Sequence, residues 1–357
     1  MKKTLIITLI IIVVIIACIF LYMTVFFDST LYKIGNVKKN YSFSSVRQQE
    51  LGEKGRIKVS DSIELYYFTE GKGTPILVLH GGPGYPYSTP KKTLSTLSDS
   101  YRFIYYHQRG SGLSTKPFNK FVSANYYQNM KNLEANLGIA ANLADIEHFR
   151  RVLGLEKLIL IGHSFGGFLA TLYGAEYPEH LEKLVLAAPA NLLKMPAEKG
   201  HSLYDAIEEN LQDPSQKSDF KVYQKQLFDF GSIFKRSEKQ IAELQGKIGL
   251  YFYLASKTLI PEIDASSSDF ETELIGGWPF YAISFSIGKR CDYREALRSI
   301  KCPTLLIYGE KDLVQKENYN NYIEYLENIS VKTLENSGHF LLDESQEAAK
   351  LIRDFLD

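Results

Sequence analysis

A candidate nucleophile is the first residue in this chain whose surroundings suggest chemistry. Ser164 lies in Gly162-His163-Ser164-Phe165-Gly166, between the apolar run 158–161 and a helix-like segment. A sharp turn from strand to helix exposes a serine Oγ at the strand tip, and the flanking glycines avoid clashes there. The N-terminus of the helix also favours developing negative charge. The pattern therefore predicts Ser164 as a nucleophile.

Two downstream residues could supply the base and the acid that a serine nucleophile needs. Asp312 follows the apolar run 304–308, and His339 follows a second strand-like run at 331–334. The order serine, acid, histidine, with each residue after a strand, accompanies this kind of turn. We predict a triad of Ser164, Asp312 and His339, with Glu310 as the alternative acid.

Acyl transfer by such a triad also requires N–H donors for the oxyanion of the tetrahedral intermediate. One donor is conventionally the residue after the nucleophile, here Phe165. The other is expected in the loop His80-Gly81-Gly82-Pro83-Gly84, because glycines let the backbone approach a substrate closely. We predict Gly82, with Gly81 as the alternative. His80 and His163 are expected to be structural.

The elements that must position these residues can be predicted from hydrophobic patterning. Amphipathic stretches, clearest at residues 142–153, separate most of the apolar runs, which are typical of central strands. Two shorter strand candidates flank the turn at residues 60–62. The alternation predicts an α/β fold with a doubly wound, mostly parallel sheet. The central runs are residues 75–80, 103–106, 158–161, 184–188 and 304–308.

The alternation is interrupted between about residues 191 and 296, where helix-like segments follow one another. We interpret this stretch as a helical cap over the ligand crevice, which lies beyond the carboxyl ends of parallel strands. The expected organisation is a membrane anchor (1–27), a linker (28–55), the first part of the core (56–190), the cap (191–296) and the second part of the core (297–357).

The N-terminus has the pattern of a membrane-spanning segment. Residues 4–27 carry no charge and are long enough as a helix to cross a bilayer core of about 30 Å. We predict an uncleaved transmembrane anchor with the catalytic domain on the extracytoplasmic side. The alternatives are a cleaved secretory signal and a lipoprotein-type cleavage before Cys18. All three place the rest of the chain outside the cytoplasm.

Composition excludes several classes of function. The 41 basic and 41 acidic residues balance, and no run of Lys and Arg could follow a phosphate backbone, so nucleic acid is not an expected partner. Cys18, Cys291 and Cys302 are too few for a disulfide framework or a metal knuckle. Cys291 and Cys302 could form a bridge, but two buried thiols are the simpler interpretation. No cofactor or metal is expected, and the sequence leaves the oligomeric state open.

At these motifs the chain resembles the prolyl aminopeptidase (proline iminopeptidase) family of serine peptidases, within the α/β-hydrolase superfamily, from about Asp61 to the C-terminus. The loop at residues 80–84 carries the resemblance most specifically. The block 107–114 is similar to the family's Asp-Gln-Arg-Gly segment, with His107 in place of the acid. The nucleophile turn also differs from the family's Gly-Gly-Ser-Trp-Gly. Gly-His-Ser-x-Gly is common among esterases and lactonases.

The resemblance implies release of an N-terminal residue, often proline, from a short peptide. In the family, cap carboxylates bind the substrate amine, and aromatic side chains could wall a pocket for the prolyl ring. The alternative is a carboxylic-ester or lactone hydrolase; an inactive binding module conflicts with the intact triad. The candidate acids are Glu208, Glu209, Glu238, Glu243, Glu262, Asp264, Glu271 and Glu273, and the aromatic candidates are Trp278, Phe280, Tyr281 and Phe285.

Overall fold

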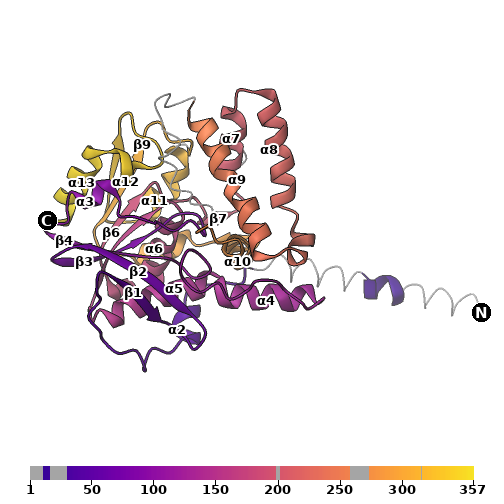
Figure 1. Ribbon diagram of the computed structural model, residues 1–357, viewed down its shortest axis with the longest axis horizontal. Helices are drawn as coiled ribbons and strands as arrows, with labels where there is room; N and C mark the ends of the chain where they lie inside the picture. Colours follow the sequence, from indigo (N-terminus) through magenta and orange to yellow (C-terminus); the bar gives the residue numbers. More distant parts are fainter. Residues whose placement is uncertain (1–10, 17–29, 198–201, 258–272, 315) are drawn as a thin grey trace, which may run out of the picture.

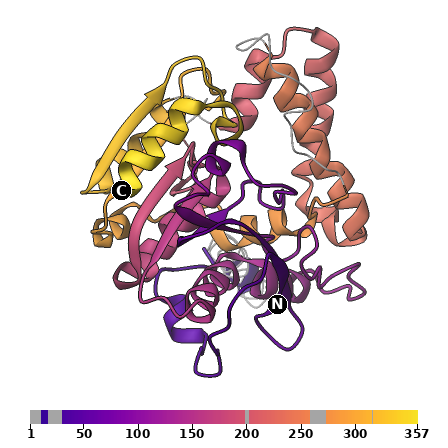
Figure 2. The ribbon, with the colours of Figure 1, turned by 60° about the vertical axis from the view of Figure 1, so that its left-hand side comes forward.

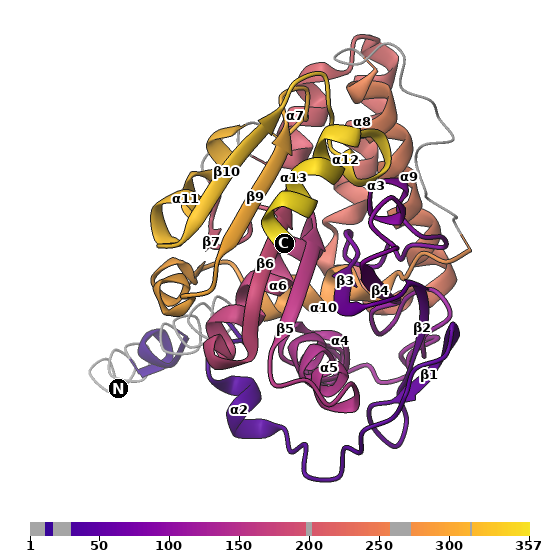
Figure 3. The same ribbon diagram turned by 90° about the vertical axis from the view of Figure 1, so that its left-hand side faces the viewer.

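A mostly parallel β-sheet positions the predicted site residues near the carboxyl ends of its parallel strands. The computed structural model describes residues 11–16, 30–197, 202–257, 273–314 and 316–357 (Figure 1). The described residues form an eight-stranded sheet of order β1-β2-β4-β3-β5-β6-β9-β10, visible from β10 to β1 in Figure 3. Within this sheet only the pairs β1–β2 and β2–β4 are antiparallel, so the predicted mostly parallel α/β fold is confirmed. The strands are β1 Lys54–Lys58, β2 Glu64–Gly71, β3 Thr74–Leu79, β4 Tyr101–Tyr106, β5 Leu158–His163, β6 Leu181–Ala187, β9 Thr304–Gly309 and β10 Ile329–Leu334.

Helices cover both faces of the sheet because its central strands are apolar on both faces. In β3, Ile76 and Val78 belong to one hydrophobic cluster, whereas Leu77 and Leu79 belong to the other. Figure 1 shows the two groups of helices above and below the sheet. The first cluster is closed by α3 (Lys92–Ser95), α12 (Leu341–Glu344) and α13 (Gln346–Leu356), and the second by α5 (Ile139–Val152) and α6 (Phe165–Glu176).

A group of helices inserted between β6 and β9 occupies the interval predicted for the cap. Figure 2 shows most of these helices, in salmon and orange, to one side of the core. The last of them, α10, packs against α4 (Tyr126–Leu137) of the core. The insertion comprises α7 (Leu203–Asn210), α8 (Pro214–Leu227), α9 (Glu238–Ser256) and α10 (Trp278–Ile287), with a short ladder of β7 (Lys194–Met195) and β8 (Cys291–Asp292) where it joins the core.

The predicted anchor, residues 1–27, lies mostly outside the described residues. Residues 11–16 are helical with exposed side chains. Within the part of the chain that the structure describes, no helix is both long enough and apolar enough to cross a membrane. The transmembrane prediction therefore has no support from the structure.

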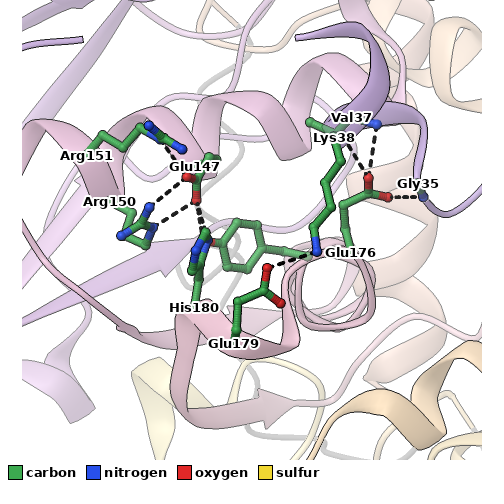
Figure 4. A network of polar contacts seen from close by, with 10 residues as sticks. Gly35, Val37, Lys38, Glu147, Arg150, Arg151, Glu176, Glu179 and His180 are labelled. Carbon is green, nitrogen blue, oxygen red and sulfur yellow. Dashed lines mark hydrogen bonds and ion pairs between the residues drawn. The ribbon is translucent and has the colours of Figure 1, made fainter. Parts of the chain in front are cut away.

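The segment predicted as a linker, residues 28–55, is instead packed on the domain from Thr30 onward. Tyr32 and Val37 are fully buried, and α2 (Asn36–Asn40) contacts α5. The carboxylate of Glu176, at the end of α6, accepts hydrogen bonds from backbone N–H groups of this segment (Figure 4). It also accepts one from the Tyr32 hydroxyl. The local sequence pattern did not predict this packing, because Glu176, which accepts these hydrogen bonds, lies about 140 residues away in sequence.

A second buried carboxylate, that of Glu147 in α5, fixes the far end of α6. It accepts hydrogen bonds from Arg150 and Arg151, and His180 lies 3.1 Å from it (Figure 4). The Tyr173 hydroxyl also donates to it. Burial acts to raise the pKa of Glu147, but hydrogen bonds from the two arginines outweigh it and lower that pKa to about 2. The carboxylate therefore stays ionised and ties α5 to the helix that begins after Ser164.

Candidate active site

Ser164 occupies a strained turn between β5 and α6. Its backbone has φ 52° and ψ −119°, a conformation that costs free energy for a residue with a side chain. The Ser164 N–H donates to the Ala187 carbonyl at 3.0 Å, which fixes the turn against β6. A Cβ at position 166 would lie 2.2 Å from the Leu79 carbonyl oxygen, and one at 162 would lie 2.4 Å from that of Gly166. Both glycines are therefore required by close packing at the turn.

Asp312 and His339 are brought together at the ends of β9 and β10. The Nδ1 atom of His339 lies 2.8 Å from Asp312 Oδ2, and the aspartate side chain is fully buried. Asp312 Oδ1 accepts the Val314 N–H at 2.9 Å, and Oδ2 also accepts the Tyr319 hydroxyl at 3.2 Å. Because an ionised carboxylate only accepts, this contact places the proton on Nδ1 and leaves the Nε2 lone pair available. Glu310, the alternative acid, is exposed.

Ser164 and His339 line the same cavity. In the described part of the chain no hydrogen bond joins Ser164 Oγ to His339; such contacts are often longer than ideal in a free enzyme. The structure thus pairs the predicted base with the predicted acid and puts the predicted nucleophile on the same cavity wall.

The predicted oxyanion loop, residues 80–84, lies directly against Ser164. A Cβ at Gly81 would be 3.1 Å from the Cβ of Ser164, and Gly81 and Gly82 both line the cavity. Gly82 has φ +117°, a conformation that favours glycine. Among the described residues, no hydrogen bond runs from the N–H of Gly82 or of Phe165 to a protein acceptor. Both groups remain the predicted oxyanion donors.

His80 supports this loop from beneath. Its Nε2 accepts the Gln108 N–H at 3.0 Å, so its Nδ1 carries the proton and donates to the Gly81 carbonyl at 2.8 Å. The Gln108 side chain donates to the His80 carbonyl at 2.9 Å. Burial lowers the pKa of His80 to about 3 and keeps the ring neutral. The structural role expected for His80 therefore includes orienting Gly81.

His163 contacts the loop that carries His339. Its Nε2 lies 2.8 Å from the His339 carbonyl oxygen, to which it donates, and the two rings are 4.9 Å apart. Burial lowers the pKa of His163 to about 3, so the ring is neutral. The sequence predicts only packing for His163. A positioning role toward His339 depends on a contact spanning 176 residues, which no local pattern could indicate.

The block that begins at His107 forms a scaffold under the site. His107 Nδ1 accepts the Leu113 N–H at 2.9 Å, and Nε2 donates to the Tyr87 carbonyl at 2.9 Å. Arg109 forms a buried, two-point ion pair with Asp145. The histidine that replaces the family's acid thus acts as both donor and acceptor, which a carboxylate could not do.

We expect the three buried neutral histidines to make the fold sensitive to acid. Burial lowers the pKa of His107 to about 4, and that of His80 and His163 to about 3, whereas in an unfolded chain each is about 6.5. Between pH 6.5 and 4 the unfolded state binds more protons, so the free energy of unfolding falls as pH falls. Thermal unfolding from pH 7 to 4 should show a falling Tm, with a shallower fall in His107→Gln. Parallel curves for the two proteins would contradict this origin.

The cavity between the sheet edge and the cap has a volume of about 1090 Å³. Its wall is rich in aromatic side chains from the cap. Phe280 and Phe285 line it as predicted, whereas Trp278 and Tyr281 are buried in a hydrophobic cluster that the cap forms with α4. Other aromatic residues in the wall are Tyr85, Tyr87, Tyr126, Tyr204, Phe228, Phe230, Phe252 and Phe340.

The described members of the predicted cap acids do not line this cavity. Glu238 accepts the N–H groups of Gly277 and Trp278 and so caps α10. The others are paired or exposed on the surface: Glu208 with Lys221, Glu243 with Lys239, and Glu209 and Glu273 exposed. Glu262, Asp264 and Glu271 lie outside the described residues.

Two carboxylates that sequence analysis did not select line the cavity instead. Asp205 in α7 accepts hydrogen bonds from Ser202 through Oδ2, and Asp343 in α12 forms an ion pair of 3.0 Å with the buried Lys91. Asp205 lies in the predicted cap, but nothing in its local sequence distinguishes it from the other acids. Asp343 follows His339 by four residues, a spacing with no recognised meaning in this fold.

The described cysteines and acids suggest no further chemistry. Cys291 and Cys302 are free thiols, so the possible bridge between them is not formed. Within the described residues, no group of His, Cys, Asp and Glu side chains has the arrangement of a metal site.

The strand order, the strained serine turn and the cap define the class of protein. The chain belongs to the α/β-hydrolase fold family, whose model matches residues 74–346. Within that family it is similar to proline iminopeptidases: that of Saccharolobus solfataricus is 23% identical over 89% of this chain and 97% of its own length. The "Putative non-heme chloroperoxidase" of Synechocystis sp. is 27% identical over 71% of this chain and 80% of its own. The crystal structure of a proline iminopeptidase from Mycobacterium smegmatis has a TM-score of 0.58 at 15% identity, covering 85% of this chain and 97% of that one.

Proposed function

We propose that this protein is a serine hydrolase in which Ser164 attacks an acyl carbon. His339 Nε2 takes the proton of the serine hydroxyl, and the N–H groups of Gly82 and Phe165 stabilise the oxyanion of the tetrahedral intermediate. His339 then returns the proton to the leaving group, and water hydrolyses the acyl-enzyme by the same steps. The observation that carries this proposal is the 2.8 Å contact between His339 Nδ1 and Asp312 on the cavity wall that also holds Ser164.

For the substrate, we propose an aminopeptidase that releases proline or another small apolar residue from short peptides. The glycine-rich loop at residues 80–84 and the likeness to the Saccharolobus solfataricus enzyme over nearly its whole length support this reaction. A substrate amine would need a carboxylate partner, because a buried cation without one is costly. Asp205 and Asp343 are the carboxylates that line the cavity.

The aminopeptidase proposal predicts a strict requirement for a free amine. The purified full chain in detergent should hydrolyse proline or alanine p-nitroanilide, and N-acetylation of the substrate should abolish turnover. Rapid ester cleavage with no turnover across a panel of aminoacyl anilides would overturn it.

A second candidate is a carboxylic-ester or lactone hydrolase. The observation that favours it is the aromatic wall of the cavity, together with the absence from that wall of every described acid predicted to bind an amine. An ester hydrolase needs no cation partner, so N-acetylation would leave its activity unchanged.

We also propose that residues 4–27 anchor the protein in a membrane, with the catalytic domain on the extracytoplasmic side. The support is the uncharged apolar run of the sequence. The full chain should then stay in the membrane pellet after an alkaline carbonate wash, and external protease should digest its catalytic domain in intact spheroplasts. Release into the wash, or protection from the protease, would contradict the proposal.

A further inference from the structure

The segment that leads into the catalytic domain forms part of the cavity wall. Leu31 lines the cavity, and the N–H groups of Leu31 and Tyr32 both donate to the Ser286 carbonyl of α10 at 3.0 Å. The hydroxyl of Thr30 donates to the Arg290 carbonyl just beyond that helix. The segment thus lies along the end of α10.

Glu176 holds this segment in place (Figure 4). Its carboxylate is buried and accepts the Tyr32 hydroxyl at 3.0 Å and the Gly35 N–H at 2.6 Å through one oxygen, and the Val37 and Lys38 N–H groups through the other. Such charge-assisted hydrogen bonds are stronger than neutral ones. Leu31 is therefore a fixed part of the wall.

This end of the cavity is lined mainly by apolar side chains, with Lys289 as a charged residue at its margin. Phe285 and Ile287, on either side of Ser286, line the same cavity, as does Met130 on α4, the helix against which α10 packs. A volume of about 1090 Å³ slightly exceeds the roughly 300–1000 Å³ of pockets that enclose drug-sized ligands, so one prolyl residue would occupy a small part of it. The remaining space suits an extended apolar group.

The sequence places this end of the cavity near a bilayer. Thr30 follows the apolar run 4–27 by three residues, which span at most about 10 Å when extended. If that run is an anchor, the Leu31 end of the cavity lies close to the membrane surface. Lys33 and Arg290 are exposed beside it, and cations at this position attract anionic headgroups.

We propose that the substrate is an amphiphile of the bilayer, whose apolar chain enters at the Leu31 end while its scissile acyl group reaches Ser164. Leu31 then determines specificity by contacting that chain. This inference rests on the proposed serine hydrolase and on the proposed anchor, and it extends the substrate class to amides or esters with a long apolar group.

Alkyl fluorophosphonates of two lengths test this inference, because they react with any activated serine whether the enzyme prefers amides or esters. The full chain is placed in phosphatidylcholine vesicles containing phosphatidylglycerol. The second-order labelling rate should be at least about tenfold higher for the dodecyl than for the ethyl probe, since each buried methylene adds binding energy. Leu31→Trp should reduce that ratio to near one. Leu250→Trp, at a cap position 58% exposed and outside the cavity wall, is the matched control.

The possible outcomes distinguish failure of this inference from failure of the serine hydrolase and membrane-anchor proposals on which it rests. Equal rates for the two probes, or a ratio that Leu31→Trp leaves unchanged, would overturn the inference while Ser164 remains a nucleophile. The labelling rate of the dodecyl probe should depend on the probe's concentration in the bilayer. Dependence on its concentration in water instead would contradict entry of the substrate from the membrane. If neither probe labels, the nucleophile proposal fails. Binding of the fluorescent fatty acid cis-parinaric acid to Ser164→Ala then tests the part of the inference that concerns the apolar chain. Binding weakened by Leu31→Trp supports entry of that chain at the Leu31 end, and any other result overturns it.

Discussion

Replacing Ser164 with alanine is expected to lower kcat by about 10⁴- to 10⁶-fold, because the remaining oxyanion donors and binding contacts cannot replace the nucleophile. The fold should tolerate the change. Alanine keeps the Cβ that already occupies the turn at φ 52°, and the turn is held by backbone hydrogen bonds to Ala187 and Ala190 that do not involve the hydroxyl.

The measurements for Ser164→Ala are kcat on the best substrate of the anilide and ester panel, fluorophosphonate labelling, and Tm. The matched control is Ser284→Ala, at a serine that lines the same cavity from α10 and bonds only to its own helix. It should retain activity within about threefold, because no base activates that hydroxyl. Persistent labelling of Ser164→Ala would show that another residue is the nucleophile.

The fold could be predicted largely because its determinants are local. Apolar runs such as residues 158–161 and 304–308 correspond to β5 and β9, since a strand buried on both faces needs apolar side chains throughout. The location of the candidate site residues could be predicted for the same reason. Parallel strands have their carboxyl ends on the same side of the sheet, so the residues that follow β5, β9 and β10 lie close together there.

The features that the sequence does not predict depend on contacts between distant parts of the chain. Val37 and Tyr32 are buried because Glu176, far away in sequence, accepts the polar groups around them. His163 contacts the His339 carbonyl only after the sheet has formed. The sequence could not select among the candidate cap acids for a related reason: a glutamate such as Glu238 has the same local pattern whether it caps a neighbouring helix or faces a cavity.

Asp312→Asn is expected to lower kcat by about 10⁴-fold through the tautomer of His339. Oδ1 of Asp312 accepts the Val314 N–H at 2.9 Å, so the amide oxygen of asparagine would keep that position. The amide NH₂ would then replace Oδ2 and face His339 Nδ1 at about the present separation of 2.8 Å. An NH₂ group donates, which forces the histidine proton onto Nε2. A ring protonated at Nε2 cannot accept the proton of Ser164.

The matched control for Asp312→Asn is Glu310→Gln, which neutralises the exposed acid two residues earlier. Its kcat should stay within about twofold of the unchanged protein, because an exposed carboxylate has no contact with the imidazole. Single-turnover acylation isolates the step in which His339 removes the serine proton. Its rate constant should fall by the same factor as kcat in Asp312→Asn. A loss in Glu310→Gln that exceeds the loss in Asp312→Asn would assign the acid to Glu310. A loss confined to Asp312→Asn, with Tm little changed, would assign it to Asp312, because the lost rate then reflects proton transfer rather than unfolding.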